Sequence, residues 1–371
     1  MRILQVVSDL NLSNGITNVL MRYFRKMSTT DIRFDFLCFD CDESDIKSNY
    51  FKEEIEKLGG RVFYINSPLN FFAFRKDWNK FCREHFQQFS ILENNIPFLG
   101  FFFKNAKQML GVKKIITHAH ATKFGDNAFT NLRNQMFMII TGYKVGDILF
   151  AASEEAANKI FKWHLRKKTL YIINNAFDLS NFVFNIERRK NVRKKMNWDG
   201  KYIVGHVGRF TSQKNHKLII NAFRSLCKQD QTAYLVLIGE GELLPQIKKI
   251  VTEYGLNNRV CFLKRRSDVN ELLQGMDTFI FPSVFEGLGV AVVEAQVAGL
   301  PCLVSDNVPK EANISKYKIL SNRTSSIVWG KELYKLKNKA RILNGIKLAQ
   351  KKGFDINLEF QKLVKIYHQL N

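Results

Sequence analysis

The chain has 371 residues, of which 46% are hydrophobic and 25% charged, so length and composition predict a folded protein of two domains and argue against disorder. Lys and Arg number 57 against 34 Asp and Glu, and a formal net charge of +23 attracts nucleic acid, anionic lipid or phosphorylated ligands, unless it is only a solvated surface. No run approaches about 18 uninterrupted apolar residues, so no membrane-spanning helix is predicted.

Short apolar runs alternate with amphipathic stretches along the first half of the chain. Residues 2–7 predict a strand, and a helix follows in which apolar residues recur at helical spacing. Further strands are predicted at residues 34–39, 61–65, 114–119 and 147–153. This alternation is typical of a parallel sheet with helices on both faces.

A polar, basic segment over residues 185–200 precedes a second series of the same kind. The predicted strands of this second series lie within residues 201–210, 233–242, 259–266, 277–283 and 301–307. The predicted fold class is therefore α/β, with two doubly wound Rossmann-like domains in tandem.

We expect an amino-terminal domain over residues 1–180, a linker over 181–200 and a carboxy-terminal domain over 201–352. Residues 353–371 predict an amphipathic helix that could pack back across a cleft between the domains. Because ligands bind beyond the carboxyl ends of the strands in doubly wound sheets, two such domains facing each other predict a ligand site in that cleft.

The six cysteines are scattered, as in proteins of a reducing cytoplasm. Cys38 and Cys41 form a C-x-x-C motif. A zinc site would need a second pair and a redox site would need a helix start, and the sequence indicates neither, so we expect no functional role for this pair.

One turn of the second series carries residues that could bind an anion. A predicted strand ends at Val207, and Gly208 turns the chain. Arg209 and Lys214 follow, before a helix that begins near Asn215. A guanidinium binds phosphate oxygens in pairs, and a lysine and a helix N-terminus add positive charge, so this turn could hold a diphosphate. From spacing alone, two exposed cations of a basic protein explain the pattern better.

The stretch FPSVFEGLGVAVVEAQVAGLP is apolar or small almost throughout but contains two carboxylates. Glu286 is predicted in the loop after a buried strand, and Glu294 on the helix that follows. A carboxylate in apolar surroundings needs hydrogen-bond donors, which the hydroxyls of a sugar or a ribose would supply, as would backbone groups of a neighbouring loop. Gly287 and Gly289 would let the backbone approach such a ligand closely.

These motifs resemble, over nearly the whole chain, the signature of the retaining GT-B glycosyltransferases of family 4, and most closely their bacterial capsular and exopolysaccharide members. The resemblance is carried by Glu286-x7-Glu294 followed by GLP, and by GHVGRF with Lys214 five positions after Arg209. The motifs SEEAANKIF, LIGEGELLPQI and VCFLKRRSDVNELLQGMD match in the same order.

The resemblance implies a role for each of these residues. Arg209 and Lys214 would bind the diphosphate of a nucleotide sugar, Glu286 would contact sugar hydroxyls, and His120 would face the reacting sugar. The residues that it implies in donor binding, with Arg266 near the base, Glu294 on the ribose and Gly15 on the amino-terminal side, are Gly15, Gly208, Arg266, Gly287, Leu288, Gly289 and Glu294.

Two features near these residues remain open. His118 and His120, two apart on a predicted strand, point the same way and could suggest a metal, but no third ligand is visible and the family needs none. The first loop, LSNGITN, has only Gly15 where the family usually has paired glycines, which leaves the acceptor side open.

The resemblance implies transfer of a hexose, with retention and without a metal or cofactor, from a nucleotide diphosphate sugar of the UDP type to a hydroxyl of a lipid-linked saccharide in surface polysaccharide synthesis. Aromatic and basic residues are mixed between residues 63 and 103, which suits an anionic membrane surface, although core aromatics in a chain with 32 Phe would give the same mixture. We therefore expect a cytoplasmic protein, peripheral on the inner face of the plasma membrane, with no nucleic acid partner.

Three alternatives stay open. A basic nucleic-acid-binding protein is supported only by charge, without a recognisable motif. A sugar-nucleotide epimerase could use the same two-domain scaffold. An inactive partner subunit would keep the fold alone, although Arg209, Lys214, Glu286 and Glu294 are all present.

Overall fold

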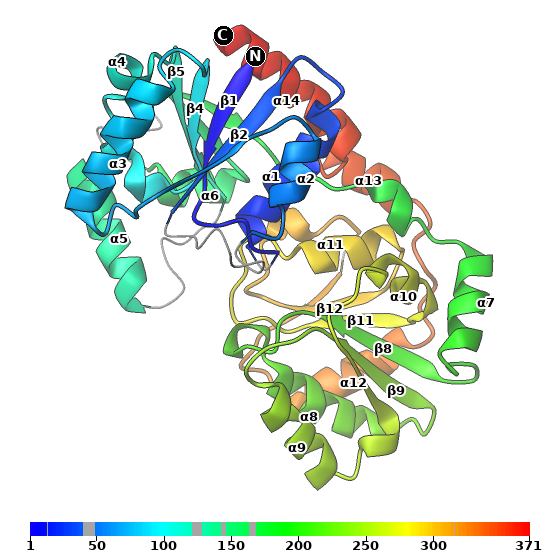
Figure 1. Ribbon diagram of the computed structural model, residues 1–371. Coiled ribbons are helices and arrows are strands. Elements are labelled where there is room, and N and C mark those ends of the chain that lie inside the picture. The colour runs from blue at the N-terminus through cyan, green and yellow to red at the C-terminus, as the bar shows by residue number, and fades with distance from the viewer. Residues whose placement is uncertain (13, 40–48, 121–127, 142–145, 163–167, 316) are drawn as a thin grey trace. The chain divides into compact units, whose positions relative to one another are not determined.

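The computed structural model describes residues 1–12, 14–39, 49–120, 128–141, 146–162, 168–315 and 317–371. The chain divides into two compact units (Figure 1). The first unit contains Met1–Phe177 together with Asp355–Asn371, and the second contains Asp178–Phe354. Each unit is built on one parallel sheet with helices between its strands, so the expectation of two doubly wound domains is confirmed. The cleft expected between them stays a prediction.

The sheet of the first unit has the strand order β3-β2-β1-β4-β5-β6-β7. Its strands are β1 (Arg2–Val6), β2 (Arg33–Phe39), β3 (Val62–Ile65), β4 (Ile91–Asn94), β5 (Lys114–Ala119), β6 (Ile148–Ala151) and β7 (Thr169–Ile172). The chain leaves β1 toward one edge of the sheet and returns to β4 on its other side, so the order of strands reverses between β1 and β4. This switch point is where doubly wound sheets bind ligands.

Helices cover both faces of this first sheet. They are α1 (Gly15–Met27), α2 (Lys52–Lys57), α3 (Phe71–Glu84), the 3-10 helix η1 (Pro97–Phe103), α4 (Ala106–Leu110), α5 (Ala128–Thr141), α6 (Glu154–Ile160) and α14 (Ile356–Leu370). The side chain of Asn14 caps α1 by accepting from the backbone N–H groups of Ile16 and Thr17. The apolar face of α1 and that of α14 are buried in one core cluster, so the last helix of the chain completes the core of the first unit.

The sheet of the second unit has the order β10-β9-β8-β11-β12-β13 and reverses between β8 and β11. Its strands are β8 (Tyr202–Val207), β9 (Ala233–Ile238), β10 (Val260–Leu263), β11 (Thr278–Phe281), β12 (Cys302–Ser305) and β13 (Lys318–Leu320). The strands β8, β9, β11 and β12 are buried almost throughout and mostly apolar, as expected where helices cover both faces of a sheet. The α-helices are α7 (Ile186–Lys195), α8 (His216–Cys227), α9 (Leu244–Glu253), α10 (Val269–Gly275), α11 (Val290–Val297), α12 (Ser326–Leu336) and α13 (Gly345–Lys351). The 3-10 helices are η3 (Leu179–Phe182), η4 (Ser212–Lys214), η5 (Asn257–Arg259) and η6 (Lys310–Ala312).

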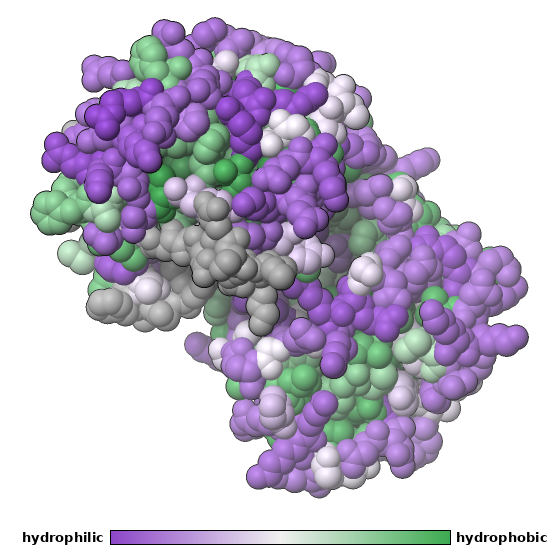
Figure 2. All heavy atoms as spheres, viewed as in Figure 1, coloured by the Kyte–Doolittle hydropathy of each residue, from purple (hydrophilic) through white to green (hydrophobic). Residues whose placement is uncertain are grey.

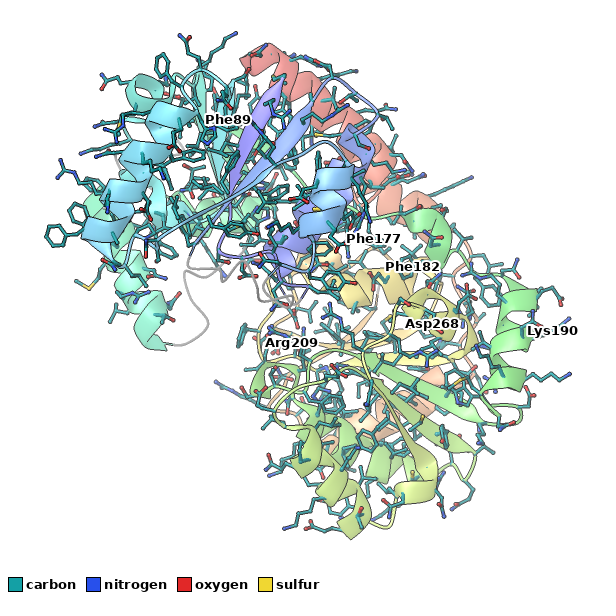
Figure 3. All side chains as sticks on the ribbon, in the orientation of Figure 1. Phe89, Phe177, Phe182, Lys190, Arg209 and Asp268 are labelled. Carbon is teal, nitrogen blue, oxygen red and sulfur yellow. The ribbon has the colours of Figure 1, made fainter. Side chains whose placement is uncertain are left out.

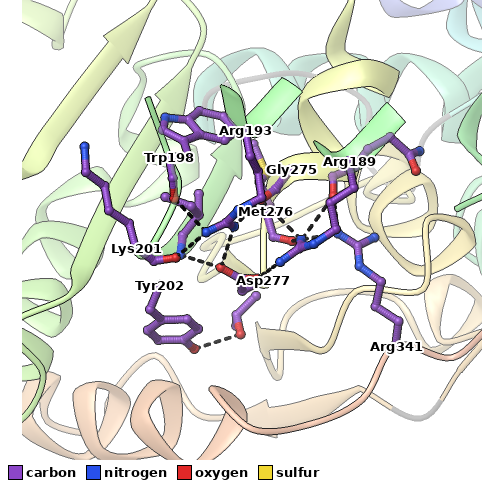
Figure 4. A network of polar contacts seen from close by, with 12 residues as sticks. Arg189, Arg193, Trp198, Lys201, Tyr202, Gly275, Met276, Asp277 and Arg341 are labelled. Atoms are coloured by element: carbon purple, nitrogen blue, oxygen red, sulfur yellow. Dashed lines mark hydrogen bonds and ion pairs between the residues drawn. The ribbon is translucent and has the colours of Figure 1, made fainter. Parts of the chain in front are cut away.

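The basic segment that precedes β8 belongs to the second unit, where α7 is tied to the start of β11 (Figure 4). Arg189 Nη2 donates to Asp277 Oδ1 at 2.6 Å, and Arg193 Nη1 donates to Asp277 Oδ2 at 3.2 Å. Both guanidinium groups also donate to the backbone carbonyl of Gly275, at the end of α10. These two cations therefore hold α7 in place and complement the negative end of the α10 dipole.

Arg341 reaches the same place from the segment between α12 and α13 (Figure 4). Its Nη2 donates to the carbonyl oxygens of Met276 at 2.6 Å and Gln274 at 2.7 Å. Burial, followed by the repulsion of Arg189, lowers the pKa of Arg341 to about 9. Three arginines thus lie close to one carboxylate, and Asp277 offsets part of their positive charge.

We expect Asp277→Ala to lower the free energy of unfolding by about 3 kcal/mol, because it leaves partly buried guanidinium groups without their counter-ion. Glu187→Ala is the matched control, since Glu187 pairs with Lys190 on the exposed side of α7, and such surface pairs contribute less than about 1 kcal/mol. Urea unfolding of both variants measures the difference. Equal losses would show that Asp277 has no special role.

Candidate functional site

The reversal of strand order in the second unit brings two loops together. β8 pairs in parallel with β11, with Val204 opposite Thr278 and Gly205 opposite Phe279. The carboxyl ends of parallel neighbouring strands lie at the same end of the sheet. Here the segments that follow β8 and β11 continue toward opposite sides of the sheet. The loop after β8 carries Arg209 and Lys214, and the loop after β11 carries Glu286.

An ion pair joins the two loops. Lys214 Nζ lies 2.5 Å from Glu286 Oε1, and the side chains are only 14% and 7% exposed. Lys214 Nζ also lies 4.8 Å from the centre of the Phe281 ring. A buried ion pair that is shielded from water stays strong, because little solvent screens it. The structure thus brings together two of the residues that the sequence predicted to act on one ligand.

Backbone contacts hold the same two loops at a fixed spacing. Val284 N donates to the carbonyl oxygen of Gln213 at 2.8 Å. In return, Gln213 Nε2 donates to the carbonyl oxygen of Phe285 at 3.0 Å. The residues on either side of the ion pair are therefore anchored, so that Lys214 and Glu286 keep their positions without relying on each other alone.

Arg209 projects from the loop after β8 and is exposed (Figure 3). Its guanidinium makes no hydrogen bond or ion pair with any residue in the described ranges of the chain. Its backbone is held on both sides, because Gly208 N donates to the Ile238 carbonyl and Phe210 N donates to the Glu240 carbonyl. A rigid backbone with an unengaged guanidinium is an arrangement suited to binding an anion.

Two glycines let these loops pack closely. A Cβ on Gly208 would lie 2.8 Å from His206 Nε2 and 3.2 Å from the side chain of Lys214, so a larger residue would push the lysine away. Gly289 caps α11 with φ +82°, a left-handed conformation that favours glycine. The predicted Gly287 is exposed and Leu288 is buried, and both lie in the turn that leads to the N-terminus of α11.

The remaining donor-site predictions in this unit lie further from the ion pair along the chain. Glu294 is half-buried in the second turn of α11. Arg266 follows the edge strand β10, which β9 separates from β8, so the sheet does not bring it beside Lys214. Arg266 instead forms a two-pronged ion pair with Asp268, with both N···O distances 2.6 Å. Asp268 is labelled in Figure 3.

Arg266 borders a small pocket on the second unit. The pocket has a volume of about 210 Å³ and lies between α7 and the start of α10. Its lining residues are Asn191, Val192, Lys195, Met196, Arg266, Asp268, Glu271 and Leu272. The role of Arg266 at a nucleotide base stays a prediction.

Two buried histidines lie beneath the Arg209 loop. His206 on β8 and His216 at the start of α8 are 0% and 2% exposed. His206 Nδ1 donates to the carbonyl oxygen of Ile280 at 2.9 Å, and His216 stacks on Phe210 with ring centres 4.0 Å apart. Burial, followed by the charge of Lys214, lowers the pKa of His216 to about 4, and burial also holds the pKa of His206 well below its usual range. Both rings are neutral at pH 7.

The predicted residues of the first unit follow two strands, β1 and β5, that lie on either side of β4. Gly15 begins α1 after β1, and His120 follows β5. His120 Nε2 lies 2.8 Å from Asn95 Oδ1, and Asn95 follows β4, the strand between β1 and β5. Asn95 was not predicted from the sequence because β4 was not predicted, since its residues Ile91–Asn94 end in polar side chains. The signal available was the apolar pair Ile91-Leu92 after a helical stretch.

The sequence suggested two further features to check in the structure, the His118–His120 pair as metal ligands and the Cys38–Cys41 motif. In the described part of the chain, no group of three or more His, Cys, Asp or Glu side chains could hold a metal ion. His118 and His120 instead stack on each other, with ring centres 3.8 Å apart. Cys38 is buried in β2, and Cys41 lies outside the described residues.

Comparison with known sequences identifies related proteins. A profile described as Glycosyl transferases group 1 matches residues 188–321. The chain is 30% identical over 320 residues to "Putative glycosyltransferase EpsF" of Bacillus subtilis (strain 168), a match that covers 84% of this chain and 81% of that protein. It is 24% identical to the capsular polysaccharide biosynthesis glycosyltransferase CapH of Staphylococcus aureus, over 86% and 87% of the two chains.

A third relative is named for its substrates. The UDP-Gal:alpha-D-GlcNAc-diphosphoundecaprenol alpha-1,3-galactosyltransferase of Escherichia coli is 21% identical, over 80% of this chain and 77% of its own. Among solved structures, Anabaena HepE in complex with UDP and glucose matches with a TM-score of 0.77 and 17% identity, over 100% of both chains. This likeness and the two parallel sheets confirm the expected GT-B fold.

The neutral state of His216 predicts a loss of stability in acid. The unfolded chain binds this proton near pH 6.5 but the folded protein only near pH 4, so the stability is fully present above pH 6.5 and declines as the pH falls toward 4. We expect the free energy of unfolding to fall by about 1–2 kcal/mol from pH 7 to pH 5 through this residue. Urea unfolding should show a smaller fall in His216→Gln, with exposed His368→Gln as the control. An unchanged pH dependence in His216→Gln would contradict the prediction.

Proposed function

Because the chain belongs to the glycosyltransferases of group 1, we propose that it is a retaining, family 4 enzyme that transfers a hexose from a UDP-type nucleotide sugar. The observation that carries the proposal is the buried Lys214–Glu286 pair at the carboxyl ends of β8 and β11, with the unengaged guanidinium of Arg209 on the same loop as Lys214. Cations that could bind a diphosphate and an acid that could bind sugar hydroxyls meet there at the switch point of one sheet.

In the proposed reaction the leaving diphosphate gains negative charge as the bond to the sugar breaks. Arg209 would bind its oxygens through a planar guanidinium, and Lys214 would add a second positive charge. Fixed charges aimed at the developing charge commonly supply the largest part of catalysis. The N–H groups of the first turn of α11 would add partial positive charge beside them. Because the protein supplies these charges, the proposal needs no metal ion.

Glu286 would accept hydrogen bonds from hydroxyls of the transferred sugar. Its ion pair with Lys214 keeps it an acceptor and fixes its position. A glycosidase scheme with two acids around the anomeric carbon fits less well, because Glu294 lies in the second turn of α11, whereas Glu286 lies in the loop that follows β11. Glu294 would bind the ribose of the donor.

The proposed acceptor is a hydroxyl of a lipid-linked saccharide in the synthesis of a surface polysaccharide. The relatives support this choice: one is named for capsular polysaccharide biosynthesis, and another for a saccharide on diphosphoundecaprenol. The second name also supports a UDP sugar as the donor, as does the UDP bound to Anabaena HepE. No described helix is long and apolar enough to cross a membrane.

An exposed apolar surface of the first unit supports a peripheral membrane partner. Four of the aromatics of residues 63–103 that the sequence suggested for this role, Phe74, Trp78, Phe81 and Phe103, are buried in the core. A group of other apolar residues, both aromatic and aliphatic, is exposed at the start of α3 and along α5, where Figure 2 shows hydrophobic residues at the surface. This group, called the α3–α5 surface here, consists of Leu69, Phe71, Phe72, Leu132, Met136 and Ile139.

The α3–α5 surface is continuous and has basic neighbours. The rings of Phe102 and Phe137 stack with centres 5.8 Å apart, and Phe71 lies 6.5 Å from Phe102, so aromatic contacts link α3, η1 and α5. Exposed cations flank these elements at Arg75, Lys76, Lys104 and Arg133. Apolar side chains beside cations match the interface of an anionic bilayer. We propose that this surface brings the enzyme to its lipid-linked acceptor.

We expect Arg209→Ala to lower the transfer rate by about a hundredfold or more, since it removes a charge aimed at the leaving group. The protein should keep its fold, because the guanidinium is exposed and has no partner among the described residues. Lys217→Ala, an exposed cation on α8, is the matched control. The assay measures release of UDP from UDP-glucose, UDP-galactose and their N-acetyl forms with a membrane extract as acceptor, and thermal shift by UDP reports binding.

The proposal fails if UDP does not raise the melting temperature of the wild type, or if Arg209→Ala transfers sugar at the normal rate. Analysis of the donor after incubation without acceptor tests the epimerase alternative, which predicts a new UDP sugar. Binding to DNA that falls steeply with salt, with no response to UDP, would favour the nucleic-acid alternative.

We expect the triple variant Leu132→Gln, Met136→Gln, Ile139→Gln to weaken binding to phosphatidylglycerol-containing vesicles by about tenfold or more, since each apolar side chain adds about 1 kcal/mol of transfer free energy. Co-sedimentation at low salt measures it. Leu358→Gln, an exposed apolar residue of α14 in the same unit, is the control. If the wild type does not bind, or the triple variant binds equally well, the α3–α5 surface does not meet a membrane.

A further inference from the structure

A chain of buried polar side chains leads to His120 inside the first unit. Gln5 on β1, Glu93 on β4, Asn95 after β4 and His118 on β5 are each at most 3% exposed. Tyr367 of α14 is 1% exposed and joins them from the last helix. Buried polar groups are costly unless they are hydrogen-bonded, so such a chain needs a reason.

The carboxylate of Glu93 accepts three hydrogen bonds from this group of buried polar side chains. Glu93 Oε1 accepts from His118 Nδ1 at 2.8 Å. Glu93 Oε2 accepts from the hydroxyl of Tyr367 at 2.5 Å and from Gln5 Nε2 at 3.1 Å. A carboxylate only accepts, and it therefore fixes which way each partner faces.

The direction set by Glu93 passes through two amides to His120. Gln5 turns its Nε2 to Glu93, so its Oε1 faces Asn95 and accepts from Asn95 Nδ2 at 2.8 Å. Asn95 must then present its Oδ1 to His120 Nε2, 2.8 Å away. An amide oxygen accepts only, so the proton of His120 lies on Nε2.

The atoms left without partners agree with this assignment. In the described residues, His118 Nε2 and His120 Nδ1 are buried and accept no hydrogen bond. With protons on His118 Nδ1 and His120 Nε2, both unpartnered atoms are lone pairs, and a buried acceptor without a partner is more readily tolerated than a buried N–H. Burial, followed by His118, holds the pKa of His120 well below its usual range, so its ring is neutral and has one N–H.

We propose that Glu93 is a positioning residue, which sets the proton positions of the stacked His118–His120 pair and thereby fixes the orientation of the His120 ring, with Tyr367 anchoring Glu93. The inference rests on the proposed function for the role of His120, but the proton positions themselves can be measured without any activity. Tyr367 connects this pair to α14, so the end of the chain contributes to the site.

Glu93→Gln tests the proposal with little change in shape. One of the two carboxylate oxygens becomes an amide donor, which faces either His118 or Gln5. In the first case His118 must move its proton to Nε2, and in the second the two amides turn over and His120 must move its proton to Nδ1. Selective ¹⁵N labelling of histidine in the full chain, with resonances assigned from His118→Phe and His120→Phe, distinguishes these tautomers by their ring nitrogen shifts.

We expect one of the two histidines to change tautomer in Glu93→Gln, and Glu93→Asp, which keeps an acceptor-only group, to retain both. In the transfer assay, kcat should fall about tenfold or more in Glu93→Gln, by analogy with the loss when the carboxylate that orients a metal-bound histidine is removed, while KM for the donor changes much less. Unchanged tautomers in Glu93→Gln overturn the proposal whether or not the protein transfers sugar. A rise in the KM of Glu93→Gln for the donor, with kcat unchanged, also overturns the proposal.

Tyr367→Phe provides a second test if Glu93→Gln does not fold. It removes one donor to Glu93 while the ring stays packed against Phe34 and Phe150. The control is Tyr23→Phe, since Tyr23 is 2% exposed and donates to the Asn174 carbonyl, outside the chain of contacts. We expect kcat to fall several-fold only in Tyr367→Phe, with shifted ¹⁵N signals of His118. Equal effects of the two substitutions would mean a purely structural role for Tyr367.

Discussion

The buried pair of Lys214 and Glu286 is the interaction on which the candidate site depends. The pair joins the loops that follow β8 and β11, the two neighbouring strands between which the strand order of the described second sheet reverses. The backbones of Gln213 and Val284 are hydrogen-bonded to each other, which holds the two loops together beside the pair. Glycine at position 208 is needed for the same reason, since any side chain there would occupy the space of Lys214. The ion pair, the hydrogen bond between the two loops and the small residue at position 208 therefore depend on one another.

Each unit places polar groups where its strand order reverses, but the two do so differently. The second unit leaves a cation exposed at Arg209 and supports it with neutral, buried histidines. The first unit buries its polar groups and connects them to a single carboxylate, Glu93. An exposed cation suits a charged ligand that arrives from solvent, whereas a buried, oriented imidazole suits a group that must keep one orientation. The same fold would thus support the electrostatic role proposed for one unit and the positioning role proposed for the other.

The sequence predicted the strands that form short, mostly apolar runs. β8, β9 and β11 are of this kind, and their burial on both faces explains why the apolar runs were sufficient to find them. β4 was missed because a strand of four residues ending in Glu93 and Asn94 has little hydrophobic signal, even though both side chains are buried. The side-chain partners of Glu93 are Gln5, His118 and Tyr367, which are distant in sequence, so one sequence alone does not reveal them. The positions of Lys214 and Glu286 at one edge followed from strand ends, but their contact depended on the strand order. The aromatic residues of α3 were harder to interpret, because Phe72 on the surface and Phe74 in the core belong to one run of letters.

The path of the chain has a consequence for how the protein is made. The core of the first unit includes Leu363, Ile366 and Tyr367, yet the whole second unit is translated before they are. At ordinary rates of synthesis, the first 177 residues wait on the order of 10 s for the helix that completes their core. During that time the second unit can finish folding from contiguous sequence, while the apolar side of α1 lacks its partner. The half of the chain that the ribosome delivers first is therefore the half that can be completed last.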